Sequence, residues 1–155
     1  MSHKFFILAL ALVLSGCATA NKNIITEFKP ALTEDKKALR SLFVGKWISE
    51  QPNDKGGKNM TTVDRMADSR YINEFKVFDS TSTLTKEHRE FGYWGVSGGV
   101  YFTMFRGWIN GETLSPSNPA DAYNYDTYQI VESSSNKLVY KSLSSGNLYT
   151  YTRAK

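Results

Sequence analysis

From residue 43 onward, apolar and polar positions alternate in short runs that are separated by turn-forming residues. Alternation with a period of two indicates strands that are buried on one face. The chain shows no internal repeat, and it lacks the alternation of strands and helices that is typical of a parallel sheet. We therefore predict eight consecutive antiparallel strands, at residues 43–50, 59–66, 70–78, 84–96, 100–109, 122–132, 137–143 and 147–153.

One short helix is predicted ahead of these strands, over residues 33–42. Thr33 is a suitable N-cap, and two acidic residues follow in the first turn, where the helix dipole favours negative charge. Leu39 and Leu42 fall on one face of this helix. Because so short a helix is marginal in water, we expect it to pack against the strands.

Eight antiparallel strands in succession are enough to close an up-and-down barrel. Closure removes the two unpaired edges that an open sheet would leave. Gly98-Gly99 is a strong signal for a two-residue hairpin, because primed turns need positive φ angles. We predict an all-β fold, an eight-stranded up-and-down antiparallel barrel with one short N-terminal helix. A sandwich of two sheets is the alternative architecture.

Residues at the start of the first predicted strand and at the end of the last one resemble a pattern of the lipocalin (calycin) superfamily. Gly45-Lys46-Trp47, just after the helix, matches the Gly-x-Trp of that superfamily, and Arg153 ends the last strand, where lipocalins often place an arginine over the tryptophan. The resemblance covers roughly residues 38–155. It implies that Gly45, Trp47 and Arg153 close one end of the barrel. A guanidinium stacked on an indole would contribute about 1 kcal/mol there.

The first twenty residues differ from the rest of the chain. Phe5 to Leu14 is an unbroken apolar run, half the ~20 residues that span a bilayer, and it has the length of the apolar part of a secretory signal peptide. Leu14-Ser15-Gly16-Cys17 follows and resembles the lipobox of bacterial lipoproteins. The resemblance implies that residues 1–16 are a lipoprotein signal peptide and that a lipid such as palmitate is attached to Cys17.

The resemblances together divide the chain into a signal peptide at 1–16, a lipid-anchored flexible tether at 17–32 and a lipocalin-like β-barrel domain at 33–155. Ala18 rather than aspartate follows the lipidated cysteine. By resemblance to the sorting of Gram-negative lipoproteins, this residue favours the outer membrane. We expect a lipid-anchored protein of the cell envelope, which faces the periplasm if the cell is Gram-negative.

Composition narrows the classes of partner and chemistry. The 155-residue chain has a net charge of +4 and scattered Lys and Arg residues, so we expect no nucleic acid. The single cysteine excludes a disulfide framework and a multi-cysteine metal site. We expect no metal, no cofactor and no catalytic residue, and hence no enzyme. The only cluster that could do acid–base work is His88, Glu90 and Asp126, if they converge near the barrel mouth.

Loops alternate between the two ends of an up-and-down barrel. The longer loops 51–58, 79–83, 110–121 and 144–147 therefore share one end, and the tight turns 67–69, 97–99 and 133–136 share the other with the helix. We predict a roomy mouth and a pinched base. The loop 110–121 is the longest at the mouth, and it contains Pro116 and Pro119, which stiffen it.

The Gly98-Gly99 turn fixes which residues of the two flanking strands share a face. The predicted pairs run from Val96–Tyr101 to Glu90–Gly107 and His88–Ile109 on one face. On the other face they run from Gly95–Phe102 to Phe91–Arg106 and Arg89–Trp108. Neither face is polar, so we place Trp94 inward by resemblance to lipocalin-like domains. The alternative is that the opposite set, which contains Phe91, Tyr93, Phe102, Met104 and Trp108, forms the core. The predicted ligand-binding residues are then Trp94, Tyr101, Phe105, Tyr128 and Tyr140, and a predicted outer patch for a partner contains Phe91, Arg106 and Trp108.

Two classes of function follow from this fold. The first is a membrane-anchored lipoprotein that binds a small hydrophobic ligand or lipid in the barrel, since eight strands can enclose one small ligand. The alternative is an envelope protein-interaction module, an assembly factor or enzyme inhibitor, with a filled barrel. Residues 97–101 and 145–149 both read Ser-Gly-x-x-Tyr, which resembles part of a motif in membrane-bound inhibitors of c-type lysozyme.

The lipobox makes a direct prediction. Replacing Cys17 with Ser removes the thiol that accepts the lipid, so the Cys17→Ser protein should leave the membrane fraction, which immunoblotting of fractionated cells would measure. A Ser15→Ala variant, which keeps a small residue beside the cleavage site, should stay with the membranes. Membrane association of the Cys17→Ser protein would contradict the anchor.

Overall fold

The computed structural model describes residues 34–155, so the predicted signal peptide, the tether and Cys17 lie outside the described residues. No helix in the described part is long and apolar enough to cross a membrane. The elements are α2 (Glu34–Phe43), β1 (Gly45–Pro52), β2 (Lys58–Arg65), β3 (Arg70–Phe78), β4 (Leu84–Ser97), β5 (Val100–Asn110), β6 (Thr113–Pro116), the 3-10 turn η1 (Ala122–Asn124), β7 (Tyr125–Ser133), β8 (Lys137–Ser142) and β9 (Leu148–Arg153).

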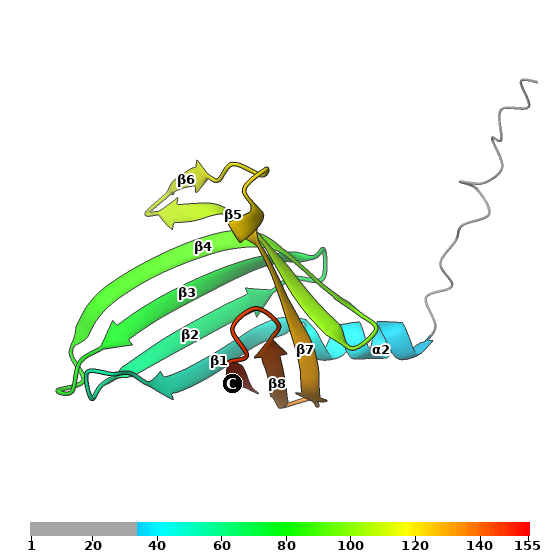
Figure 1. Cartoon of the computed structure of the whole chain (residues 1–155), viewed down its shortest axis with the longest axis horizontal. Coiled ribbons are helices and arrows are strands. Elements are labelled where there is room, and N and C mark those ends of the chain that lie inside the picture. Colours follow the sequence, from blue (N-terminus) through cyan, green and yellow to red (C-terminus); the bar gives the residue numbers. More distant parts are fainter. Residues whose placement is uncertain (1–33) are drawn as a thin grey trace, which may run out of the picture. The chain divides into compact units, whose positions relative to one another are not determined.

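Eight of these strands form a closed antiparallel barrel (Figure 1). Neighbouring strands follow the order β4-β3-β2-β1-β9-β8-β7-β5, and β4 also pairs with β5, which completes the ring. The predicted eight-stranded up-and-down barrel with one short N-terminal helix is confirmed. The alternative sandwich is wrong, because hydrogen-bonded pairs run around the whole ring.

The predicted starts of strands differ most from the observed ones at two places. The first strand was predicted from residue 43, but Phe43 ends α2, because its ring packs into the barrel against Trp94 and Tyr101. The strand predicted at 122–132 starts at Tyr125. The residues before it form η1, whose first backbone amides are capped by the side chain of Asp121.

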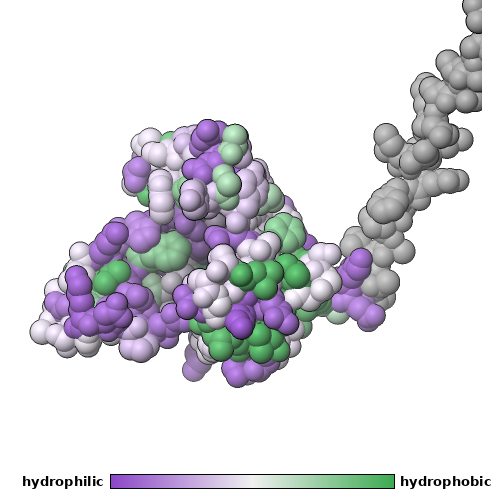
Figure 2. Space-filling model, viewed as in Figure 1, coloured by the Kyte–Doolittle hydropathy of each residue, from purple (hydrophilic) through white to green (hydrophobic). Residues whose placement is uncertain are grey.

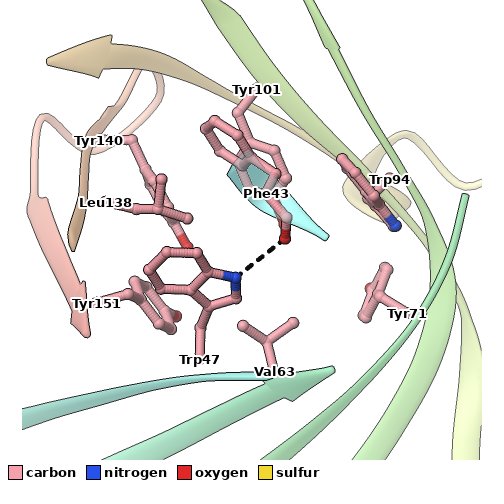
Figure 3. Close-up of a cluster of buried hydrophobic side chains, with 9 residues drawn as sticks. All are labelled: Phe43, Trp47, Val63, Tyr71, Trp94, Tyr101, Leu138, Tyr140 and Tyr151. Atoms are coloured by element: carbon pink, nitrogen blue, oxygen red, sulfur yellow. Dashed lines mark hydrogen bonds between the residues drawn. The ribbon is translucent and has the colours of Figure 1, made fainter. Parts of the chain in front are cut away.

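Large side chains fill the end of the barrel that α2 covers. The ring of Phe43 lies 5.4 Å from that of Tyr101, and Trp47 Nε1 donates a hydrogen bond of 3.0 Å to the Phe43 carbonyl oxygen. This end is therefore closed by packing rather than by a lid. The buried apolar core consists of Phe43, Trp47, Val63, Tyr71, Trp94, Tyr101, Leu138, Tyr140 and Tyr151 (Figure 3).

Arg153 fastens the end of the last strand to the first strand and to α2. Its guanidinium carbon lies 4.2 Å from the centroid of the fully buried Trp47 ring, within the usual cation–π reach of about 6 Å. The same guanidinium donates hydrogen bonds to the carbonyl oxygens of Leu42 at 2.9 Å, Val44 at 3.0 Å and Ser135. The carbonyl oxygen of Leu42 is in the last turn of the helix and has no partner within it, so this bond satisfies it.

Gly45 is required by this same contact. Its φ angle of +104° lies in a region that L-residues rarely adopt, and a Cβ atom there would lie 2.9 Å from Arg153 Nη1. The Gly-x-Trp resemblance therefore has a physical basis in this chain, since glycine leaves room for the arginine that stacks on the tryptophan.

The helix lies at the end of the barrel that was predicted to be pinched. Arg40 stacks over the Trp94 ring at 4.6 Å and donates hydrogen bonds to the Ala67 carbonyl oxygen and to Ser69 Oγ. Arg153 bonds to Ser135. The helix thus contacts the turn 67–69, the C-terminal strand contacts the turn 133–136, and the longer loops are left at the other end, the mouth.

A β-bulge in β5 changes which side chains point inward. Pairing follows the prediction from Ser97–Val100 to Gly92–Phe105 and then shifts by one residue. Phe91 pairs with Gly107, Glu90 with Trp108 and Arg89 with Ile109. The predicted pairs beyond the shift are therefore wrong: Phe91–Arg106, Glu90–Gly107, Arg89–Trp108 and His88–Ile109. Arg106 is the extra residue, and beyond it the two faces of the strand exchange.

Gly107 makes the bulge possible. Its φ angle is +148°, and a Cβ atom would lie 2.2 Å from the carbonyl oxygen of Ser115 in β6. The strand β6 lies within the stretch 110–121 that was predicted to be a loop, and it pairs Gly107 with Pro116 through to Asn110 with Thr113. The first half of β5 pairs instead with β7. The β5–β6 hairpin therefore diverges from the barrel beside its mouth (Figure 1).

Replacing Arg153 with Ala should lower the free energy of unfolding by roughly 3 kcal/mol, because the stacked cation and its bonds to carbonyl oxygens are lost together. Urea denaturation would measure this change. The control is Arg70→Ala, since Arg70 is exposed and only pairs with Asp68 at 2.7 Å, so about 0.5 kcal/mol is expected. Equal effects of the two substitutions would show that Arg153 does not close the barrel.

Candidate functional site

A cavity of about 340 Å³ opens at the mouth of the barrel. Its volume lies at the lower end of the range found for small-molecule sites, roughly 300–1,000 Å³. The molecule is visibly hollowed beneath the lobe that β5 and β6 form (Figure 2). The residues that line this mouth cavity are Tyr71, Phe75, Glu90, Thr103, Phe105, Trp108, Tyr123, Asn124, Asp126 and Tyr128.

Aromatic rings in contact with one another form one wall of the mouth cavity. Trp108 meets Phe105 edge to face at 4.9 Å between ring centroids, and its other neighbour is His88 at 5.4 Å. His88 in turn stacks on Phe75 at 4.8 Å. This row spans β3, β4 and β5, so three adjacent strands fix the orientation of the indole. Trp108 is nevertheless 42% exposed, which leaves a face of the ring for a ligand.

The rim of the cavity is held by the segment that leads into β7. Asn124 is buried, and its Nδ2 donates to the Asn118 carbonyl oxygen at 2.6 Å and to Ser117 Oγ at 3.3 Å. The hydroxyl of Tyr125 donates to the Pro119 carbonyl oxygen. These hydrogen bonds connect the two ends of the segment 117–125 to each other at the mouth. They leave Tyr123, which is 93% exposed, standing at the edge of the cavity.

Two carboxylates, those of Glu90 and Asp126, line the mouth cavity. Glu90 Oε1 accepts hydrogen bonds from the Tyr71 hydroxyl at 3.0 Å and from Asn73 Nδ2 at 2.9 Å. Burial raises the pKa of Glu90 against the effect of these two bonds, and the neighbouring charge of Asp126 raises it further. Burial also raises the pKa of Asp126. Neither carboxylate forms an ion pair within residues 34–155.

A buried cation lies in the closed-end core. Arg65 is 1% exposed, donates to the hydroxyls of Tyr101 at 3.1 Å and Tyr140 at 3.0 Å, and is further surrounded by the rings of Phe43 and Tyr151. Burial alone would lower the pKa of this guanidinium, but the tyrosines raise it above its ordinary value, so Arg65 stays charged. Its Nη1 has no hydrogen-bond partner among the described residues.

The predicted ligand-binding residues divide between the two ends of the barrel. Phe105 and Tyr128 line the mouth cavity, as the inward assignment implied. Trp94, Tyr101 and Tyr140 also point inward, but they are buried in the closed-end core and do not line the cavity. The inward face was therefore predicted correctly along this part of the chain, whereas the height of each residue in the barrel was not.

The predicted outer patch is wrong in one of its three residues. Trp108 lines the mouth cavity, because the bulge at Arg106 turns it inward. Arg106 stays outside, with its guanidinium 5.4 Å from the Tyr125 ring. Phe91 also stays outside, in a largely apolar groove of about 300 Å³ between β3, β4 and the β5–β6 hairpin. The patch thus loses its largest side chain to the cavity.

The predicted convergence of His88, Glu90 and Asp126 is partly observed. Glu90 and Asp126 line the same cavity, while His88 lies beside it between two rings and lines a separate cleft. Burial lowers the pKa of His88, which favours its neutral form. In the part of the chain that the structure describes, no three His, Cys, Asp or Glu side chains are placed to hold a metal ion.

Sequence reasoning missed several residues of the site. Tyr71, Phe75 and Tyr123 were not singled out, and neither was the buried Arg65. The misplacement of Trp108 had one available signal, the glycine at position 107 in the middle of a strand, since such a glycine often marks a bulge or the close approach of another backbone.

Comparison with known proteins adds little to this geometry. No family model matches the chain, and no curated protein matches it in sequence. The chain is similar to the crystal structure of a lipocalin-like protein from Bacteroides uniformis, with 13% identity and a TM-score of 0.44, over 73% of this chain and 99% of the other. We take the architecture from the strand pairing itself: an eight-stranded barrel that is filled at one end and hollow at the other.

The Glu90 carboxyl predicts an unusual dependence of stability on pH. Its pKa is higher in the folded protein than in the unfolded chain, so the folded state binds more protons above the ordinary value of 4.5, and stability falls as the pH rises from there through the folded pKa. Glu90→Gln keeps an oxygen for Tyr71 and Asn73 but removes the charge. Thermal unfolding should show that the variant is more stable than the wild type at pH 7.

This difference should shrink toward pH 4, where the wild-type carboxyl is protonated. Glu112→Gln, at an exposed turn, is the matched control and should change stability little at either pH. A Glu90→Gln variant that is less stable than the wild type at pH 7 would show that a cation such as Arg65 compensates the Glu90 charge.

Proposed function

We propose that this protein is a binding protein of the cell envelope that holds a small, largely apolar ligand in the mouth cavity. The observation that carries the proposal is the cavity itself, about 340 Å³ lined by the rings of Phe75, Phe105 and Trp108 at the one end of the barrel that side chains do not fill. Concave aromatic walls with a few polar groups are typical of small-molecule sites.

The filled end of the barrel limits the size of the ligand. Trp47 and Trp94 are almost completely buried at the closed end, and the mouth cavity meets this filled end at Tyr71, which both lines the cavity and belongs to the buried core. A compact molecule, or one end of a longer lipid, matches this space better than a whole lipid.

A lipid anchor on Cys17 belongs to the same proposal. Its support is the apolar run followed by Leu-Ser-Gly-Cys. The fifteen residues 18–32, if extended, reach roughly 50 Å at ~3.3 Å each, which would let the barrel bind ligands clear of the lipid surface. In a Gram-negative cell the protein would stand on the outer membrane and face the periplasm.

We propose binding rather than catalysis, and a ligand rather than a protein partner. His88 is packed between two rings beside the cavity, and no hydroxyl or thiol nucleophile has a histidine hydrogen-bonded to it among the described residues. The protein-interaction alternative assumed a filled barrel and a partner patch that included Trp108, whereas the barrel has a cavity at its mouth and Trp108 lines it.

N-Phenyl-1-naphthylamine, a neutral probe that fluoresces in apolar sites, tests the proposal. We expect the domain to bind one probe molecule, Trp108→Ala to weaken binding at least threefold, and Thr103→Trp to abolish it by filling the cavity. Val131→Ala, on an exposed β7 position that does not line the cavity, is the control and should bind as the wild type does. Circular dichroism would confirm that each variant folds. Unchanged probe binding by folded Thr103→Trp and Trp108→Ala proteins would place the working surface elsewhere.

A further inference from the structure

We propose that the ligand of the mouth cavity is a small organic monocation, an amine with an aromatic or apolar body, whose charge is neutralised by Glu90 and Asp126. This inference rests on the proposed function, because it concerns the same cavity. It goes further by giving the ligand a charge, which neither the fold nor the size of the cavity specifies.

The charge of the cavity lining is opposite to that of the chain. The chain contains 19 Lys and Arg residues and has a net charge of +4, yet the ten lining residues include two acids and no Lys, Arg or His. The acids come from β4 and β7, which pair with β5 from its two sides. A ligand that rests on Thr103 and Phe105 of β5 would therefore have a carboxylate on each flank.

The protein leaves these carboxylates without a positive partner. Arg65 is the buried cation among the described residues, and its side chain donates hydrogen bonds to the hydroxyls of Tyr101 and Tyr140 rather than to either acid. The mutual repulsion of Glu90 and Asp126 is therefore not relieved by an ion pair within residues 34–155. Titratable groups held in a cleft at such a cost are candidates for a functional site.

Hydrogen-bond acceptors outnumber donors around Glu90. Both of its bonds end on Oε1, from Tyr71 and Asn73, and Oε2 has no bond to the described residues. The Oδ1 atom of the same Asn73 has no hydrogen-bond partner there either, but it is buried and Asn73 does not line the cavity, so Glu90 Oε2 is the free acceptor that belongs to a lining residue. An ammonium group supplies up to three N–H donors and no acceptor, which is what this arrangement lacks.

The walls of the cavity suit the remainder of such a ligand. The face of an indole or phenyl ring attracts a cation by about 0.5–2 kcal/mol, and the same rings cover an apolar body. Trp108 and Phe105 stand together in β5, and Tyr123 stands exposed at the rim. A neutral ligand would use only these rings and would leave the charges of Glu90 and Asp126 without a partner.

Three probes of similar size separate charge from apolar contact: phenethylamine, 2-phenylethanol and phenylacetate, which carry a positive, a neutral and a negative end at pH 7. Isothermal titration calorimetry on the full barrel domain would give their affinities. We expect the amine to bind at least tenfold more tightly than the alcohol, and phenylacetate more weakly than both.

Glu90→Gln and Asp126→Asn should each weaken the amine at least threefold and leave the alcohol within twofold. Glu112→Gln removes the same formal charge at an exposed turn outside the cavity and should change neither affinity. Thermal unfolding of each variant would show that it folds. If Glu90→Gln does not fold, Asp126→Asn alone tests the inference.

The possible failures are distinguishable. Equal affinities for the amine and the alcohol, or an amine affinity that neither acid variant changes, would overturn the cation inference and leave the proposed function standing. Tighter binding of phenylacetate would overturn it as well, because it would show that the cavity favours a negative charge. If the wild-type protein binds neither N-phenyl-1-naphthylamine nor any of the three probes, the proposed function itself is overturned.

Discussion

The stacking of Arg153 on Trp47 is the contact on which the closed end of the barrel depends. One guanidinium joins the last strand to the first, and it also satisfies the final carbonyl oxygens of α2. Phe43 is thereby held over the barrel interior, where it packs on Trp94 and Tyr101. Because these side chains use the volume of one end completely, the free volume of the barrel lies at the other end. The position of the candidate site is thus a consequence of how the chain closes.

The single extra residue at Arg106 then decides the chemistry of that free volume. Without the shift, the two faces of β5 would keep their alternation, and Trp108 would lie on the outside of the barrel. With the shift, Trp108 joins Phe105 in the cavity wall, and it pairs with Glu90 of the adjacent strand β4. Beyond the shift β5 pairs with β6 from Gly107 onward, whereas its pairing with β7 ends at Met104.

The sequence predicted the barrel well, because a few recognisable residues set its turns and its closure. Gly98-Gly99 sets a hairpin, and the glycine at position 45 leaves room for Arg153 to stack on Trp47. The bulge could not be predicted from alternation, because both faces of β5 are apolar and neither register leaves a charge in the wrong place. Pattern also says which side chains point inward but not how far up the barrel they lie. For that reason Trp94 was expected to contact a ligand, although it packs below the cavity.

A closed barrel has no unpaired strand edge, yet this one has β6 attached to its rim. On its outer side, β6 has no neighbour among the described strands, so its backbone could template another chain. The exposed length is small, since β6 has only four residues and ends at Pro116, which has no amide hydrogen to donate. Glu112 adds a negative charge at the adjoining turn. The short length of β6, its terminal proline and the charged turn beside it therefore disfavour edge-to-edge aggregation at the mouth.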